Sequence, residues 1–327
     1  MMSKLTMVKA INLALHQELE RDDDVIVLGE DVGVDEGVFR VTEGLLKKFG
    51  EQRVMDTPLA EGAIVGMAIG MALDGLKPVA EIQFSGFSFQ AFHQIENHAA
   101  RYRQRSQGRY HCQLVVRMPY GAGVRALEHH SESEEAYYAH MPGVKVVIPS
   151  GPRNARALLV SAIRDPDPVI FMEPKALYHA VKEEVPEAEE LLPLGRAQVV
   201  REGGDVTLVA YGTMLQRALE AAERLKDEDG VEAEVIDLLT ISPLDGETVA
   251  ASVRKTGRVV VVHEAPRTCG VGAELTARIV EKAFLQLEAP VRRLTGFDIT
   301  YPGFAREKAW LPDVPRIVRA VRETLAF

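Results

Sequence analysis

The sequence predicts an α/β protein with two tandem domains, each built around a mostly parallel sheet. Short apolar runs rich in β-branched residues alternate with longer helical patterns along the whole chain, which is typical of stacked βα units. The chain has 327 residues, too many for one ordinary domain and enough for two. An acidic, proline-bearing stretch with little periodicity, residues 179–195, separates two such series of runs.

The first series opens with residues 1–24, which break into charge before any long apolar run. This start predicts an amphipathic helix rather than a signal peptide or a membrane span. Residues 61–75 carry small and apolar side chains at helical spacing, which predicts a buried helix in which Gly66 and Gly70 permit close approach. The remaining runs predict strands at 24–33, 77–84, 113–119, 144–151 and 168–174, and helices at 89–105 and 152–165.

The second series follows the acidic stretch and repeats the same alternation. Its runs predict strands at 205–212, 231–238 and 258–265, and helices at 213–226 and 272–287. We therefore expect a first domain at residues 1–180, a linker at 181–196 and a second domain at 197–327.

Composition excludes several classes of function. The formal net charge of -10 argues against a nucleic-acid partner, because a protein that binds phosphates needs a dense basic face. Two cysteines are too few for a disulfide framework and indicate a reducing compartment, so we expect a cytoplasmic protein with no membrane partner.

Ligands of α/β sheets gather beyond the carboxyl ends of strands, which gives the residues after strands first weight. Glu61 stands at the start of the apolar helix, either as a first-turn acid favoured by the helix dipole or as a carboxylate that shares a proton with a bound heterocycle. Phe87 follows a glycine at a strand-to-helix junction and is either a core residue or a flat wall for an aromatic ligand. Asp165 lies in a helix-terminal turn that either binds a cation or is a plain turn.

The glycine-rich segment 117–133 carries two adjacent histidines, His129 and His130. Adjacent histidines make a poor zinc site, since zinc helices place them four residues apart and no cysteine pair stands nearby. The segment also lacks the G-x-S-x-G elbow of a serine nucleophile. Two interpretations remain for this segment. It presents a histidine that donates or accepts a proton, or its histidines are structural or solvated loop residues.

Ten segments taken together resemble one known family, from about residue 5 to the C-terminus. The family is the beta subunit of the thiamin-diphosphate-dependent, decarboxylating component of 2-oxo acid dehydrogenase complexes. It has a pyrimidine-binding domain followed by a transketolase C-terminal-like domain, in agreement with the two halves expected above. The segments are "VLGEDVG", "GVFRVTEGL", "RVMDTPLAEGAIVGMAIGMA", "AEIQF", "RMPYGAGV", "HHSES", "PGVKVVIPS", "AIRDPDPVIFMEP", "LVAYGT" and "EVIDLLTISPLD".

The resemblance implies a role for several residues. Glu61 matches the glutamate that hydrogen-bonds the aminopyrimidine ring of thiamin diphosphate and promotes its reactive imino tautomer. Phe87 matches the aromatic residue packed against that ring, with Leu59 close by. His130 matches the active-site histidine associated with proton handling and reductive acylation of the lipoyl group, whereas His129 has no such match.

The resemblance also implies a structural potassium site made largely of backbone carbonyls. Two matching residues, Cys112 and Asp167, differ from the glycine and asparagine of some relatives, which a main-chain ligand tolerates. The matching positions are Cys112, Leu114, Val115, Ala162, Asp165 and Asp167.

The diphosphate-binding motif of single-chain thiamin enzymes is absent. Single-chain thiamin enzymes hold magnesium on the diphosphate through a G-D-G…N motif, and the two "LDG" segments, at 73–75 and 244–246, lack its first glycine. We therefore expect an alpha subunit to supply the magnesium and diphosphate contacts, with the shared site at the interface of an α2β2 heterotetramer. The resemblance further implies a lipoyl-bearing acyltransferase core as a partner, for which the second domain is the expected docking surface.

Two rivals to this enzyme are disfavoured. A single-chain transketolase-like enzyme would need greater length and the diphosphate motif, and a scaffold subunit without catalysis would not retain Glu61, Phe87 and His130 together. "IQFSGFSF" and "EHHSES" are more like pyruvate-using relatives than branched-chain ones. Pyruvate is the expected 2-oxo acid substrate. The alternatives are 2-oxoisovalerate and its branched-chain kin, or the role of an acetoin dehydrogenase beta subunit.

Overall fold

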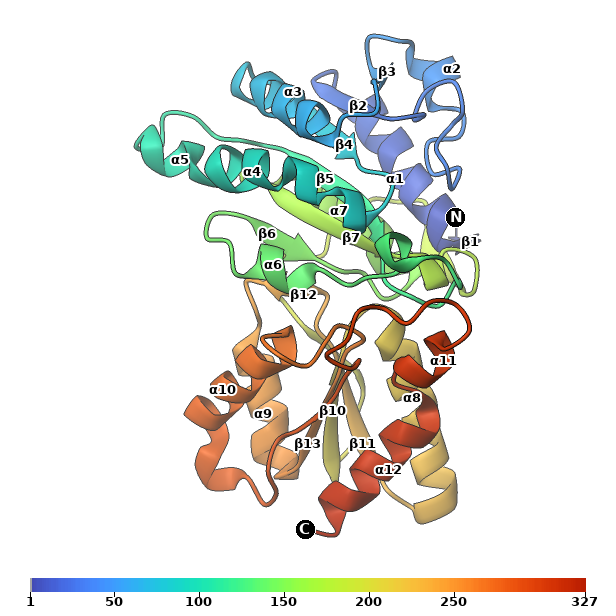
Figure 1. Cartoon of the computed structure of the whole chain (residues 1–327), viewed down its shortest axis with the longest axis vertical. Helices are drawn as coiled ribbons and strands as arrows, with labels where there is room; N and C mark the ends of the chain where they lie inside the picture. Colours follow the sequence, from blue (N-terminus) through green and yellow to red (C-terminus); the bar gives the residue numbers. More distant parts are fainter. Residues whose placement is uncertain (1) are drawn as a thin grey trace.

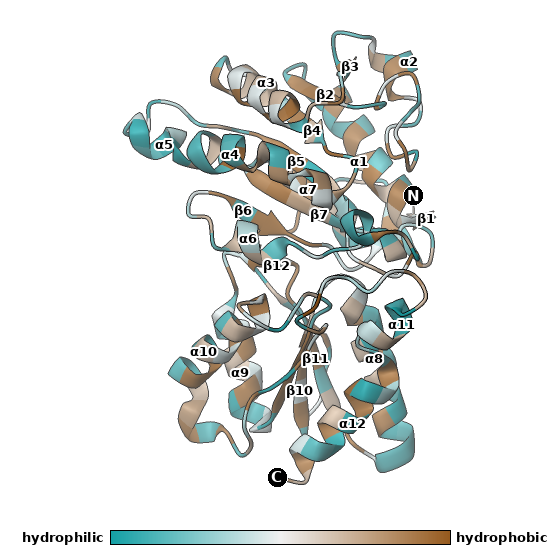
Figure 2. Ribbon diagram, viewed as in Figure 1, coloured by the Kyte–Doolittle hydropathy of each residue, from teal (hydrophilic) through white to brown (hydrophobic). Residues whose placement is uncertain are grey.

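The computed structural model describes residues 2–327 and consists of two α/β domains stacked end to end (Figure 1). The two tandem α/β domains with mostly parallel sheets that the sequence predicts are confirmed. Hydrophobic residues line the inner strands, and hydrophilic ones gather on the outer faces of the helices (Figure 2). Each sheet therefore buries both of its faces under helices, as parallel sheets require.

The first domain is built on a sheet whose strands run in the order β12-β6-β7-β5-β4-β2-β3. Neighbours within it pair in parallel except β12, which is antiparallel to β6. The strands are β2 (Val25–Gly29), β3 (Val54–Asp56), β4 (Lys77–Glu81), β5 (Val115–Tyr120), β6 (Lys145–Val147), β7 (Val169–Pro174) and β12 (Thr240–Ser242).

Helices cover both faces of this sheet. The helices α1 (Met7–Arg21) and α7 (Pro152–Arg164) pack together on one face with the strand side chains Val27 and Val79. On the other face, α3 (Glu61–Leu73) and α4 (Phe89–Asn97) pack side by side. The short helices of this domain are α2 (Leu45–Phe49), α5 (Tyr102–Arg105) and α6 (Glu135–Ala139).

The second domain has the strand order β14-β13-β10-β11-β9, with only β9 antiparallel among the described strands. Its strands are β9 (Gln198–Arg201), β10 (Val206–Ala210), β11 (Ala233–Asp237), β13 (Val259–Val262) and β14 (Arg292–Leu294). Its helices are α8 (Thr213–Asp229), α9 (Gly246–Thr256), α10 (Val271–Ala283), α11 (Glu307–Trp310) and α12 (Val314–Leu325).

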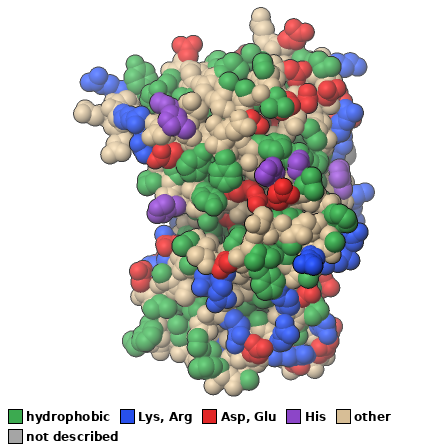
Figure 3. All heavy atoms as spheres, viewed as in Figure 1, with side chains coloured by type: hydrophobic (Ala, Val, Ile, Leu, Met, Phe, Trp, Pro, Cys, Tyr) green, Lys and Arg blue, Asp and Glu red, His purple; other side chains and the backbone are tan. Residues whose placement is uncertain are grey.

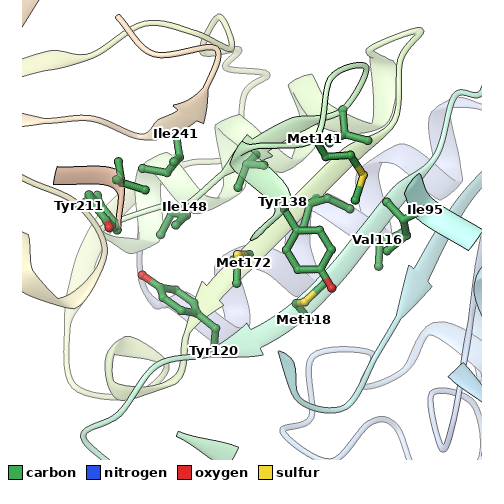
Figure 4. Packing of buried hydrophobic residues seen from close by; sticks show 14 of the residues in the cluster. Ile95, Val116, Met118, Tyr120, Tyr138, Met141, Ile148, Met172, Tyr211 and Ile241 are labelled. Atoms are coloured by element: carbon green, nitrogen blue, oxygen red, sulfur yellow. The ribbon is translucent and has the colours of Figure 1, made fainter. Parts of the chain in front are cut away.

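One of the hydrophobic clusters runs from the first domain into the second. Tyr120 and Met172 of the first sheet belong to the same buried cluster as Tyr211 and Ile241 beyond the linker (Figure 4). The two domains therefore hold each other in place, so that groups from both can meet in one site.

Several elements differ from the expectation because contacts distant in sequence decide them. Residues 2–6 do not continue the N-terminal helix but form β1 (Met2–Thr6), antiparallel to β8 (Lys182–Pro186). Strand β8 lies inside the range expected to be a linker, and β12, from the second range, joins the first sheet. Neither edge strand is long or periodic enough to be predicted without its partner.

Two helices also differ from their predictions. The helix expected at 89–105 ends at Asn97, and the chain beyond it approaches Gly143 so closely that a Cβ there would lie 2.1 Å from the Ala100 carbonyl oxygen. Helix α3 is buried on one face only, since Ala63, Met67 and Gly70 are exposed. Gly70 has open space beside it, and close approach occurs at a different glycine described below.

Candidate active site

Glu61 is the first residue of α3, at the end of the loop that follows β3. Its side chain is buried, and its Oε2 atom has no hydrogen-bond partner among the described residues. The backbone N–H groups at a helix start favour a carboxylate there. Burial raises the pKa of the nearby Glu30 carboxyl, and the charges of Asp31 and Glu61 raise it further.

The contact between α3 and α4 brings Glu61 toward the segment that carries Phe87. Gly62, the next residue of α3, faces the Gln90 carbonyl, to which an added Cβ would lie 3.1 Å away. One turn later, a Cβ at Gly66 would lie 3.7 Å from the Gln94 side chain, which is an ordinary van der Waals contact. The close approach of the two helices therefore depends on the missing side chain at Gly62.

The Phe84 and Phe87 rings form an aromatic wall around His130. The Phe87 ring, on the 3-10 turn η1 (Ser85–Phe87), lies 5.3 Å from the imidazole, and the Phe84 ring lies 4.3 Å from it. Both rings meet the imidazole edge to face, and they lie 5.8 Å from each other. The aromatic wall therefore packs against the histidine that the sequence singled out.

His130 ends the 3-10 turn η3 (Glu128–His130) and is partly buried. Burial lowers the pKa of His130, and the positive charges of Lys175 and His129 lower it further. Its Nδ1 atom is buried and has no hydrogen-bond partner among the described residues. A neutral imidazole with a free nitrogen can accept or donate a proton near neutral pH.

A buried charge cluster, formed by Glu134, Lys175 and Glu264, lies close to His130. Burial lowers the pKa of Lys175 to about 8, although the three carboxylates Glu264, Glu134 and Glu307 oppose the change. Burial raises the pKa of Glu134 to about 7, against a hydroxyl contact from Ser85. The pKa of Glu264 is also raised to about 7 by burial, although the Ala122 N–H donates to its carboxylate. Histidine and acidic side chains gather at the junction between the two halves of the molecule (Figure 3).

The remaining predicted residues of this site are more exposed. Leu59 is 67% exposed, in the loop two residues before Glu61. His129, next to the buried face of His130, is exposed as the sequence suggested for a plain loop residue.

The two segments predicted to hold potassium lie side by side. The Val169 N–H donates to the Leu114 carbonyl at 2.8 Å, and the Gln113 amide donates to the Ile163 carbonyl at 2.8 Å. The side chains of Asp165 and Asp167 already form ion pairs with basic residues. Asp165 accepts from Lys145 Nζ at 2.6 and 2.7 Å, and Asp167 accepts from Arg103 Nε at 2.5 Å.

The described residues contain no group of three or more histidine, cysteine or acidic side chains placed to hold a metal ion. A cation between these two segments would therefore depend on backbone carbonyls such as those of Cys112, Val115 and Ala162. Over residues 2–327, no helix is both long and apolar enough to cross a membrane.

The sequence reasoning missed three residues of this site. Phe84 is not singled out by the sequence, yet its ring is nearer to His130 than that of Phe87. Lys175 directly follows β7 and Glu264 lies two residues after β13. The rule that ligands gather beyond strand ends would have found both, had it been applied to these strands as well.

Comparison with known proteins places this arrangement in a family. Residues 3–180 match the model of the transketolase pyrimidine binding domain, and residues 195–317 match that of the transketolase C-terminal domain. The chain is 51% identical over 326 residues to the pyruvate dehydrogenase E1 component subunit beta of Staphylococcus epidermidis, covering 100% of each. The chain belongs to this beta-subunit family. It is also 50% identical over 322 residues to the protein of the same name from Acholeplasma laidlawii, covering 98% of each.

Solved structures of transketolases share the fold of this chain. A split-gene transketolase, described as an inactive beta4 tetramer, superposes with a TM-score of 0.82 at 25% identity and 99% coverage of both chains. A transketolase mutant from Pichia stipitis superposes with a TM-score of 0.71 at 15% identity. The present chain covers 46% of that transketolase, so the shared fold accounts for about half of it.

Proposed function

We propose that this chain is the beta subunit of a pyruvate dehydrogenase that decarboxylates pyruvate on thiamin diphosphate and transfers the acyl group to a lipoyl group. The observation that carries the proposal is the conjunction of a buried, unpartnered Glu61 carboxylate with the aromatic wall and His130. The names of the full-length relatives favour pyruvate over 2-oxoisovalerate or acetoin.

The residues present fit thiamin diphosphate. Glu61 Oε2 is buried and lacks a hydrogen-bond partner in the described chain. It is therefore free to accept a hydrogen bond from a protonated ring nitrogen of the pyrimidine. The rings of Phe84 and Phe87 supply the apolar surface that an aminopyrimidine needs. When bound, thiamin diphosphate supplies an acidic thiazolium carbon that adds to the keto carbon of a 2-oxo acid and makes loss of carbon dioxide possible.

The chain's own residues bind, orient and move protons in this proposal. Glu61 holds a proton between its Oε2 atom and the pyrimidine ring, which fixes the tautomer of the cofactor. The aromatic wall orients the ring and keeps water away from it. His130, kept neutral at neutral pH by its lowered pKa, exchanges a proton through its free nitrogen while the lipoyl group is acylated.

An alpha subunit completes the site in this proposal, as an α2β2 heterotetramer. The chain matches about half of a single-chain transketolase and lacks the motif that holds magnesium on the diphosphate. Helix α3, which begins at Glu61, exposes an apolar stripe formed by Ala63, Met67 and Gly70. An apolar stripe beside an active site is the kind of surface that a partner subunit covers. The lipoyl-bearing acyltransferase core is the second proposed partner.

We propose in addition a structural potassium ion between residues 112–115 and 162–167, held by backbone carbonyls. The support is the side-by-side placement of the two segments. Replacing sodium by potassium ions at equal ionic strength should raise the melting temperature of the chain. Equal melting temperatures in the two salts would remove the potassium ion from the proposal.

We also propose a cytoplasmic location, supported by the two free cysteines, one of them exposed. Cell fractionation would test it, and recovery of the chain outside the cytoplasmic fraction would contradict it.

The deciding experiment measures substrate-dependent reduction of an artificial electron acceptor by this chain alone and mixed with an alpha subunit of the same enzyme family, in the presence of thiamin diphosphate and magnesium. Pyruvate, 2-oxoisovalerate and acetoin are compared at equal concentration. Activity confined to the mixture, with pyruvate preferred, is the expected result. Activity of this chain alone would refute the shared site, and a preference for another substrate would refute the assignment to pyruvate.

A further inference from the structure

His130 lies on a loop, residues 121–132, whose two ends meet. The Gly121 N–H donates to the Glu132 carbonyl at 3.0 Å, so the backbone leaves β5 and returns to nearly the same point. We call this segment the histidine loop. Val124, Arg125 and Leu127 at its tip are exposed, and its last turn is closed by the His130 N–H donating to the Leu127 carbonyl at 3.0 Å. Compact surface loops whose ends lie close together are frequently functional.

Charged side chains from outside the histidine loop hold its base. Lys175 Nζ donates to the Gly121 carbonyl at 2.5 Å. The Ala122 N–H donates to Glu264 Oε2 at 2.8 Å. Lys175 belongs to the first domain and Glu264 to the second, and both side chains are at most 4% exposed. Hydrogen bonds to buried charged groups are stronger than neutral ones.

The tip of the histidine loop packs against Ala176 of the first domain at Gly123, and its hydrogen bond to a distant side chain comes from the second domain. The Arg125 N–H donates to Glu307 Oε2 at 3.0 Å, and the Tyr301 hydroxyl donates to the same oxygen at 2.5 Å. Arg125 has a φ of 56°, a left-handed conformation that a residue with a Cβ adopts only under constraint from its surroundings. Glu307 is buried at the start of α11 and provides such a constraint.

The position of the histidine loop decides where the imidazole lies. The loop rests so closely on η1 that a Cβ at Gly86 would lie 2.3 Å from the His129 carbonyl oxygen. The next residue, His130, lies 4.3 Å from the Phe84 ring by centroid distance. A shift of the loop by an ångström would therefore change the distance of the imidazole from the aromatic wall, an error of the size that impairs catalysis.

We propose that Glu307, acting from the second domain through the Arg125 N–H, is a positioning residue for His130 in the transfer of the acyl group to the lipoyl group. This inference rests on the proposed function of His130. Glu264 and Lys175 fix the base of the histidine loop, and Glu307 fixes its tip. The second domain thereby takes part in the reaction, although Glu61 and His130, the residues of this chain proposed to move protons, both lie in the first domain.

The first test is independent of enzymatic activity and uses the full chain. Trypsin cleavage after Arg125, followed by mass spectrometry, reports how often the tip of the histidine loop leaves its place. Glu307→Asp keeps the charge but withdraws it by one methylene, and it should raise the cleavage rate about tenfold. Glu307→Gln keeps a carbonyl oxygen at the same reach and should stay within about twofold of the wild type. Glu323→Asp, a change of the same kind at a surface acid paired with Arg292, is the matched control.

The second test measures acyl transfer by the assembled enzyme to a lipoyl domain, beside pyruvate decarboxylation with an artificial electron acceptor. Glu307→Asp should lower the kcat of acyl transfer about tenfold and keep the rate of decarboxylation within about threefold of the wild type. Glu307→Gln should transfer the acyl group at nearly the wild-type rate. The double variant Glu307→Asp, His130→Ala should transfer no more slowly than His130→Ala, because a positioning residue has no effect without the residue it positions.

The outcomes separate the inference from the proposed function. Unchanged trypsin cleavage in Glu307→Asp refutes the role of Glu307, whatever the enzyme does. Faster cleavage together with normal transfer refutes the coupling to His130, and so does an additive double variant. A wild-type enzyme that decarboxylates no 2-oxo acid refutes the proposed function and leaves the cleavage result to stand on its own. A Glu307→Gln variant as impaired as Glu307→Asp would contradict the inference, because glutamine keeps the hydrogen-bond acceptor at full reach.

Discussion

Two groups of buried ionisable side chains lie in the first domain, and they differ in how completely their polar atoms are hydrogen-bonded. Arg117 of β5 donates to both oxygens of Glu173, at 2.8 and 2.7 Å, and forms a further ion pair with Glu81. The Tyr178 hydroxyl completes the network by donating to Glu173 at 2.5 Å. By contrast, Glu61 Oε2 and His130 Nδ1 are buried without any partner among the described residues.

The comparison teaches which buried charges belong to the fold and which to the site. The ionic network of Arg117 lies in the middle of the sheet, on β4, β5 and β7, where its groups satisfy one another. Burial raises the pKa of Glu81, while the Arg117 charge opposes this. An unpartnered buried polar group destabilises the fold, so Glu61 at a helix start and His130 on a loop beyond a strand indicate a place kept for a ligand. Four variants test this distinction.

Breaking the ionic network should have the largest effect, and the effect should be on stability. Arg117→Met leaves two buried carboxylates without their cation and should lower the free energy of unfolding by about 3–5 kcal/mol. Chemical denaturation measures the change. Arg224→Met, which removes an exposed pair with Glu228, is the control and should change it by less than about 0.5 kcal/mol. A loss below about 1 kcal/mol in Arg117→Met would mean that the network is not a stabilising part of the fold.

Glu61→Gln should leave stability nearly unchanged and suppress proton exchange at the thiazolium carbon of bound cofactor on the order of a thousandfold. An amide cannot take up and return the proton that the proposed mechanism assigns to Glu61. Deuterium exchange followed by NMR in the assembled enzyme measures the rate. Glu247→Gln, at another first-turn acid, controls for the helix dipole. Unchanged exchange in Glu61→Gln would leave only the helix dipole as its role.

His130→Ala should reduce acyl transfer to the lipoyl group about a hundredfold while cofactor affinity stays within a few-fold. The imidazole contacts the aromatic wall at its edge, so its removal leaves Glu61 and most of the pyrimidine surface in place. Single-turnover transfer and a cofactor titration measure the two quantities. His129→Ala, next to it and exposed, should behave as the wild type. Near-normal transfer in His130→Ala would exclude this histidine from the mechanism.

The sequence predicted much of the fold because its elements are set by local pattern. The strands β2, β4, β5, β7 and β10 and the helices α1, α3, α7, α8 and α10 all lie where period and composition indicated. The elements that were missed depend on partners far along the chain: β12 has a register only beside β6, and β1 only beside β8. Helix α12 is an exception, since its buried residues recur at helical spacing and this local pattern is sufficient to predict it.

The candidate site divides in the same way. Glu61, Phe87 and His130 were found from their motifs, and the structure brings Phe87 and His130 together as rings in contact. Phe84 belongs to that contact, but nothing in its motif distinguishes it from the neighbouring phenylalanines. Glu307 could not be assigned to the site, since it lies far along the chain from His130 and reaches the loop of His130 through a backbone hydrogen bond. Such contacts leave no local pattern in the sequence. For Glu264, only its position two residues after β13 pointed to the site.

The smallest effect concerns Glu134, a buried carboxyl group of the site. Its pKa of about 7 means that it stays protonated in the folded chain up to about that pH. The unfolded chain loses this proton near its ordinary pKa of 4.5, so the wild-type free energy of unfolding falls as the pH rises from 4.5 through 7. Glu134→Gln is neutral throughout and should gain roughly 2 kcal/mol over the wild type between pH 5 and pH 8. The raised pKa of Glu264 gives the same slope in both proteins and cancels in the difference. Urea denaturation at several pH values measures this difference. If the difference in the free energy of unfolding did not change with pH, Glu134 would be ionised in the folded chain. Its carboxylate would then resemble the paired charges of the Arg117 network.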